Sequence, residues 1–98
     1  MIDLQSIITV STQQISCELG DEAVVLNLST GEYFGLDPVG ARIWGWLTGP
    51  QTVGGIRDRL VAAYDADSGQ IEHDLLTLLE QLRDEGLIEV TTGAEHRA

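Results

Sequence analysis

The side chains that could perform acid–base or metal chemistry in this sequence are few and poorly grouped. The chain has two histidines, one cysteine and sixteen acidic residues. His73 falls on the polar side of a predicted helix and His96 lies near the C-terminus, so neither has a second nitrogen or sulfur ligand nearby. A transition-metal site needs several such ligands. We therefore expect no metal site and no cofactor.

Nucleophilic catalysis has equally little support. Cys17 stands in a short stretch of β-forming residues, where a lone cysteine is typical of a small strand residue rather than a nucleophile. The serines have no histidine that could serve as a general base. Gly54-Gly55 is not followed by lysine, which the chain lacks altogether, so no phosphate-binding loop is indicated. The sequence predicts a protein that is not an enzyme.

The charge of the chain restricts its partners. Sixteen acidic residues face five arginines, for a formal net charge of -11. Such a surface repels phosphate, so we expect binding neither to nucleic acid nor to membranes. Six of the acids precede Arg42, the first cation, and would steer a cationic ligand toward the first third of the chain. The single cysteine and the lack of a signal peptide or long apolar stretch predict a cytoplasmic protein.

Residue patterns divide the chain into a strand-rich first third and a helix-rich remainder. Residues 7–10 and 15–19 are β-branched stretches, and residues 23–28 and 32–36 predict a hairpin. Apolar periodicity and capping residues then predict three helices, at 38–47, from Thr52 to about Tyr64, and at 70–85 with Gly86 after its end. A short final strand is expected at 87–90. We predict one domain over residues 1–90 and a disordered tail over 91–98.

Two stretches of the sequence resemble the PqqD-like family. They read GDEAVVLNL at residues 20–28 and TGEYFGLDPVGARIW at residues 30–44, and residues 74–88 are similar to the closing helix of that family. The resemblance implies an α+β fold of the winged helix-turn-helix type, with an N-terminal three-stranded antiparallel sheet followed by three helices. It also implies a stand-alone recognition element for ribosomally synthesised and post-translationally modified peptides.

In that role the protein would bind the leader segment of a precursor peptide and present it to a leader peptidase or a modifying enzyme. Residues 33–38 resemble members from lasso-peptide pathways, whose partner is a leader peptidase. The alternative within the family is a peptide chaperone for a radical-type enzyme, as in quinone-cofactor synthesis.

The expected binding site is an edge strand with a neighbouring helix. An extended peptide can pair with the free backbone groups of such a strand, and side-chain pockets then give specificity. Gly35 within the strand indicates either a bulge or space for a bulky ligand residue. On the third helix, Leu76 lies away from the centre of the apolar face and is expected to line a groove. The predicted peptide-binding residues are Glu32, Tyr33, Phe34, Gly35, Leu36, Glu72, Leu76, Leu79 and Arg83.

Two other classes of protein fit the same order of elements. A winged-helix DNA-binding domain would place its third helix in the major groove, but residues 70–85 carry five acids and one arginine, which disfavours base contacts. A structural subunit would instead use the apolar groove as a permanent dimer interface.

Overall fold

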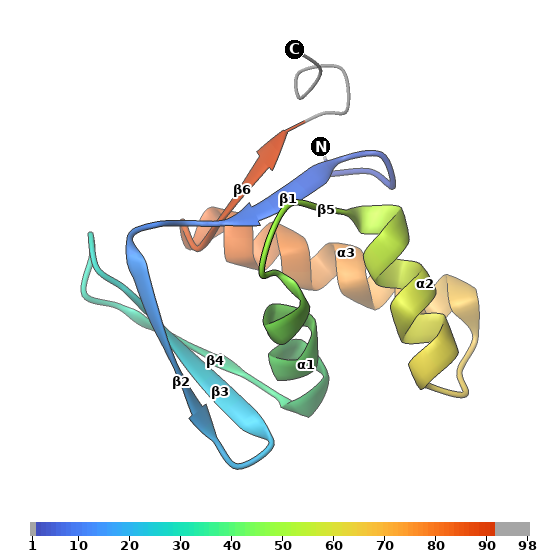
Figure 1. Cartoon of the computed structure of the whole chain (residues 1–98), viewed down its shortest axis with the longest axis horizontal. Coiled ribbons are helices and arrows are strands. Elements are labelled where there is room, and N and C mark those ends of the chain that lie inside the picture. Colours follow the sequence, from blue (N-terminus) through green and yellow to red (C-terminus); the bar gives the residue numbers. More distant parts are fainter. Residues whose placement is uncertain (1, 92–98) are drawn as a thin grey trace.

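Alternation of buried and exposed residues explains the sheet that contains the predicted hairpin. In the computed structural model, which describes residues 2–91, three strands form an antiparallel sheet in the order β2-β3-β4. They are β2 (Gln14–Leu19), β3 (Glu22–Asn27) and β4 (Tyr33–Leu36). Ala23, Val25 and Asn27 of β3 are buried, whereas the residues between them are half-buried. One face of the sheet therefore packs on the core and the other faces outward (Figure 1).

Two glycines close the hairpins of this sheet. Gly20 has φ 69° and Gly31 has φ 77°, in the left-handed region that residues with side chains rarely adopt. In the second turn, the Gly31 N–H donates to the Asn27 carbonyl at 2.8 Å, and the Asn27 N–H donates to the Glu32 carbonyl at 2.9 Å. The predicted hairpin of residues 23–28 and 32–36 is confirmed.

Side-chain caps fix the starts of the three helices, which are α1 (Pro38–Trp46), α2 (Val53–Ala63) and α3 (Ser68–Asp84). The oxygens of Asp37, Thr52 and Asp67 accept hydrogen bonds from the backbone N–H three residues further on, at 2.7, 3.1 and 3.0 Å. Because Asp67 supplies the third cap, α3 begins at Ser68, earlier than the expected residue 70. It ends at Asp84, close to the expected residue 85, and Gly86 follows in the predicted left-handed conformation with φ 74°.

The strand β1 (Ile7–Val10) lies in a second sheet, apart from the other N-terminal strands. Its neighbours are β5 (Gln51–Thr52) and β6 (Ile88–Thr91), in the order β5-β1-β6 with both pairs antiparallel. The sequence predicted the final strand but not this pairing. Thr91, expected to open a disordered tail, belongs to β6, and the remainder of that expected tail lies outside the described residues.

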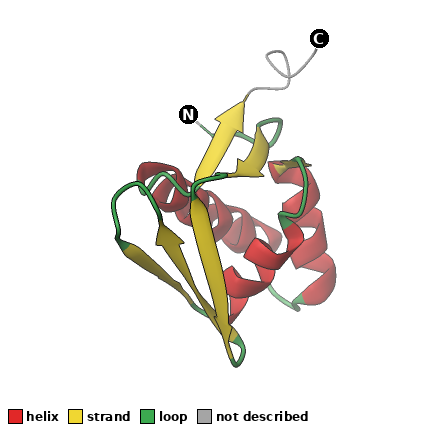
Figure 2. Cartoon of the chain, turned by 60° about the vertical axis from the view of Figure 1, so that its left-hand side comes forward, coloured by secondary structure: helices red, strands yellow, loops and turns green. Residues whose placement is uncertain are grey.

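The core lies where the two sheets meet the three helices, and Figure 2 shows the helices gathered on one side of β2-β3-β4. Its largest fully buried members come from every helix and from both sheets, and include Ile8, Val25, Ile43, Ile56, Leu75, Leu79 and Leu82. The expected α+β class is confirmed. None of the helices within residues 2–91 is long and apolar enough to cross a membrane.

Candidate functional site

The strand β4 is an open edge of the β2-β3-β4 sheet. Residues Tyr33 to Leu36 pair with β3 on one side only, and no described strand pairs with the other side. Since Asn27 and Glu32 form a hydrogen-bonded pair and such pairs alternate, Phe34 and Leu36 direct their backbone groups toward β3. Tyr33 and Gly35 direct theirs outward. The edge thus offers two N–H and two C=O groups to an extended ligand.

A groove of about 460 Å³ adjoins the end of β4. It begins at Asp37, the residue that follows the strand, and runs between the start of α1, the end of α2 and one flank of α3. Apolar side chains form most of its wall, with a few polar groups around them. The lining residues are Asp37, Val39, Gly40, Ile43, Leu60, Tyr64, Ala66, Ile71, Asp74, Leu75, Thr77, Leu78 and Gln81. An apolar groove beside a free strand edge suits an extended peptide with apolar anchors.

Close packing allows α1 to begin directly beside the end of β4. A Cβ atom at Gly40 would lie 3.2 Å from Oδ1 of Asp37 and 3.3 Å from a methyl group of Leu36. The Asp37 carboxylate accepts the Gly40 N–H at 2.7 Å, so the same aspartate caps α1 and stands at the mouth of the groove.

The groove is acidic as well as apolar. Its lining contains the carboxylates of Asp37 and Asp74, and none of its described lining residues is a cation. A cationic residue in the ligand would therefore be favoured over an acidic one. Of the six acids that were expected to steer a cationic ligand toward the first third of the chain, only Asp37 lines this groove, so that steering stays a prediction.

The flank of α3 that lines the groove carries Leu78, Asp74 and Gln81, and it lacks the helix residues that we predicted from the sequence. Glu72 instead accepts a hydrogen bond from Nη1 of Arg57 on α2 at 3.0 Å, and this bond is the largest of the interactions that raise the pKa of Arg57. Leu76 lies one turn further on the same side as Glu72 and packs against the core.

The other two predicted helix residues also have contacts within the protein. The side chain of Leu79 is 0% exposed, so it supports the core rather than meeting solvent. Arg83 forms an ion pair with Glu80 on the helix surface. None of these four residues lines the described groove: Leu76 and Leu79 contact the core, Glu72 pairs with α2, and Arg83 pairs with Glu80 of its own helix.

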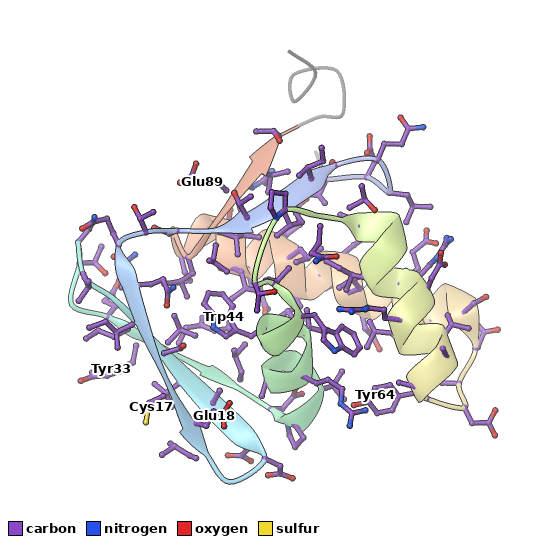
Figure 3. The ribbon with its side chains drawn as sticks, in the orientation of Figure 1. Cys17, Glu18, Tyr33, Trp44, Tyr64 and Glu89 are labelled. Carbon is purple, nitrogen blue, oxygen red and sulfur yellow. The ribbon has the colours of Figure 1, made fainter. Side chains whose placement is uncertain are left out.

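The predicted residues of β4 divide between the two faces of the sheet. Tyr33 is 71% exposed and points away from the molecule (Figure 3), and Gly35 lies on the same outer face. Phe34 and Leu36 point inward, Phe34 half-buried and Leu36 buried. Glu32 is exposed next to the strand. Because Tyr33 and Leu36 lie on opposite faces, they do not line one common surface.

Gly35 forms no bulge. The register between β3 and β4 is continuous, with Val24 opposite Gly35 and Val25 opposite Phe34. A Cβ atom at Gly35 would have no neighbour within 4 Å, so packing within the protein does not require glycine here. The bulge interpretation is therefore wrong, and the interpretation that Gly35 leaves room for a ligand residue stays a prediction.

Asn27 connects the β3-β4 hairpin to the end of α3. Its buried side chain donates from Nδ2 to the Glu85 carbonyl at 2.7 Å, and its Oδ1 accepts the N–H groups of Ser29 and Thr30 at 2.8 and 3.2 Å. The asparagine thus holds the turn before β4 and the end of α3 together. Sequence reasoning missed this residue, because the Glu85 carbonyl that it binds is 58 residues away in the chain.

Replacing Asn27 with alanine is expected to lower the free energy of unfolding by about 1–3 kcal/mol, since three backbone groups lose a buried partner. Chemical denaturation of the variant would measure this loss. Asn27→Asp is the informative companion, because it keeps the acceptor for Ser29 and Thr30 but cannot donate to the Glu85 carbonyl. An alanine variant as stable as the parent would contradict the role of this connection.

Comparisons with known proteins identify the class to which this small α+β domain belongs. The family model of coenzyme PQQ synthesis protein D (PqqD) matches residues 22–88. The chain belongs to the PqqD family. The match spans β3, β4, the three helices and the beginning of β6, and therefore covers both the open edge and the groove.

Two solved structures are similar to this chain. One is TbiB1 in complex with the TbiA(beta) leader peptide, with 40% sequence identity and a TM-score of 0.77, covering 83% of this chain and 94% of that one. The other is lasso peptide synthetase B1 complexed with the leader peptide, with 20% identity and a TM-score of 0.73, covering 84% of this chain and 96% of that one. The second likeness shows the fold alone. Among curated protein sequences, no significant match was found.

Proposed function

We propose that this protein is a non-catalytic recognition element that binds the leader segment of a ribosomally synthesised precursor peptide. The observation that carries the proposal is the open edge of β4 beside an apolar, acidic groove. Membership of the PqqD family and the 40% identity to TbiB1, a protein solved with a leader peptide, support it. We also propose that the helices and strands of this protein have the winged-helix-like arrangement of the family.

The leader adds to the sheet as a further strand beside β4. Its backbone pairs with the outward N–H and C=O groups of Tyr33 and Gly35, and its apolar side chains enter the groove next to Leu78 and Val39. A positive residue of the leader meets Asp37 or Asp74. The backbone pairing supplies affinity that is independent of sequence, whereas the groove selects the leader.

The protein then presents the bound leader to a separate enzyme. The resemblance of residues 33–38 to members from lasso-peptide pathways favours such a pathway, in which that enzyme is a leader peptidase. A PqqD-like chaperone for a radical-type enzyme is the second candidate, and the family match supports it. The two candidates share the leader site and differ only in the enzyme that receives the peptide.

The purified protein is expected to bind a synthetic leader of its cognate precursor with micromolar or tighter affinity and to leave the peptide unchanged. The TbiA(beta) leader peptide serves as a second probe. Calorimetric titration would give the affinity, and mass spectrometry would show whether the peptide is changed.

Stopped-flow mixing at rising salt should show slower association of the leader and little change in its dissociation, because salt screens the charge attraction but not the apolar contacts. Turnover of the peptide by the protein alone would contradict the proposal.

A further inference from the structure

The sheet has a second open edge, on the side opposite the proposed leader site. The strand β2 pairs only with β3, and among residues 2–91 no strand covers its other side. The Leu28 N–H donates to the Gln13 carbonyl at 3.0 Å, so by alternation the odd-numbered residues of β2 face β3. The backbone groups of Gln14, Ser16 and Glu18 therefore point outward. This edge is longer than that of β4 and has neither proline nor lysine to discourage pairing.

The outer face beside β2 is apolar. Ile15 and Leu19 are 58% and 56% exposed, and the smaller Cys17 lies between them. Cross-strand neighbours Leu26 and Val24 extend the apolar surface onto β3. An unprotected edge with exposed β-branched and aliphatic side chains is a surface that proteins normally cover.

The inner side of β2, unlike its apolar outer face, is acidic. A second groove of about 620 Å³ runs between β2 and α1, with Ser16 and Glu18 on the strand and Trp44 on the helix. Figure 3 shows Glu18 and Cys17 on opposite sides of β2, and the Trp44 side chain between α1 and the β2-β3-β4 sheet. The acids Glu18, Asp21 and Glu22 line this groove, and none of them forms an ion pair within residues 2–91.

The one cation in this groove has another partner. The guanidinium of Arg42 stacks over the ring of Tyr64, 5.6 Å from its centre, and thereby joins α1 to the end of α2. The groove consequently combines three carboxylates with the half-buried ring of Trp44. A lysine or arginine suits both, through ion pairing and through contact with the aromatic face.

We infer that β2 docks an extended segment of the enzyme that receives the leader, and that this segment alternates apolar with basic residues. This inference rests on the proposed function, because it gives the protein one edge for the leader and another for the enzyme. The apolar residues cover Ile15 and Leu19, and the basic residues enter the groove beside Glu18 and Trp44. A second copy of this chain fits poorly, because pairing β2 with β2 would bring six groove carboxylates together on chains of charge -11 each.

The direct test uses the full chain labelled with ¹⁵N and a short synthetic peptide of alternating lysine and valine. The amide signals of residues 14–19 are expected to shift on titration, and those of residues 33–36 are not. A matched peptide with glutamate in place of lysine should bind at least about tenfold more weakly, because the groove acids repel it. The shifts should persist when the cognate leader peptide is already bound.

Two substitutions probe the same edge. Ser16→Pro removes an outward N–H that bonds nothing in the sheet, and Ile15→Asp places a charge on the apolar face. Each should weaken binding of the lysine–valine peptide by about tenfold and leave leader affinity unchanged. Val61→Asp is the control, since Val61 is 40% exposed on α2, which lies on the other side of α1 from β2 (Figure 1).

Several outcomes would overturn the inference. Shifts confined to residues 33–36, the absence of binding, or a dimer in ultracentrifugation that Ser16→Pro dissociates would each exclude this docking mode. Failure of the proposed function looks different, because the leader would then bind nowhere while the lysine–valine peptide still shifts residues 14–19.

Discussion

Replacing Leu78 with aspartate is expected to weaken leader binding by roughly a hundredfold or more, because a charge then occupies the apolar wall where a leader side chain docks. Leu78 is half-buried and lines the groove on α3. The variant should remain folded with a modest loss of stability. Calorimetric titration with the cognate leader, together with thermal unfolding, would measure both effects.

Leu76 is the matched control for this substitution. It is also half-buried and packs on the core, but it lies on the opposite flank of α3, outside the groove. Leu76→Asp should therefore cost similar stability while the leader still binds. Leu75 is 2% exposed, so Leu75→Asp would place a charge in the core and is expected to unfold the domain. If Leu76→Asp loses binding and Leu78→Asp keeps it, the leader follows the other flank, as the sequence first indicated.

Placing proline at Gly35 is expected to reduce leader affinity by at least about tenfold while changing thermal stability little. The Gly35 N–H faces the open edge, so proline removes a donor that only a pairing strand would use, and its ring obstructs that strand. Titration calorimetry and thermal unfolding would separate binding from folding. A Gly35→Pro variant with normal affinity would mean that the leader does not pair with β4.

Phe34→Pro is the complementary variant. The Phe34 N–H points toward β3, so its loss should disrupt the sheet and lower stability. Gly35→Val tests the outer face instead of the backbone. Since nothing lies within 4 Å of the added Cβ atom and valine favours strands, stability should be kept, and weaker binding would show that a leader residue uses the space at Gly35.

Local features of this protein could be predicted from its sequence because they depend on neighbours in the chain. Asp37 followed by proline, Thr52 before a helical stretch and Gly86 after one each specify a helix end within a few residues. The β3-β4 hairpin is similarly determined by its short turn. The family resemblance rests on stretches that include the hairpin, Asp37 and Gly86, and the family match confirms it.

The flank of α3 that borders the groove could not be predicted in the same way. Leu76 and Leu78 lie on opposite edges of one apolar face, and helical periodicity alone does not say which edge turns toward β4. Contacts between distant residues decide it. Burial of Leu75, Leu79 and Leu82 fixes the orientation of α3. The ion pair of Arg57 with Glu72 then joins one flank to α2, and the bond from Asn27 to the Glu85 carbonyl holds the β3-β4 turn against the end of the helix.

The sheet formed by β5, β1 and β6 has a consequence for how the chain acquires its structure during synthesis. Ile7 pairs with Thr91 and Val10 with Ile88, so one side of β1 can be covered only after β6 has been synthesised, although β5 can pair with its other side earlier. The β2-β3-β4 sheet, whose partners are close in sequence, can form much earlier. Contacts of such wide sequence separation slow folding, because closing the long loop costs entropy before the contacts form. We therefore expect the proposed leader edge to form in the faster-folding part of the molecule, and the pairing of β6 with β1 to form later.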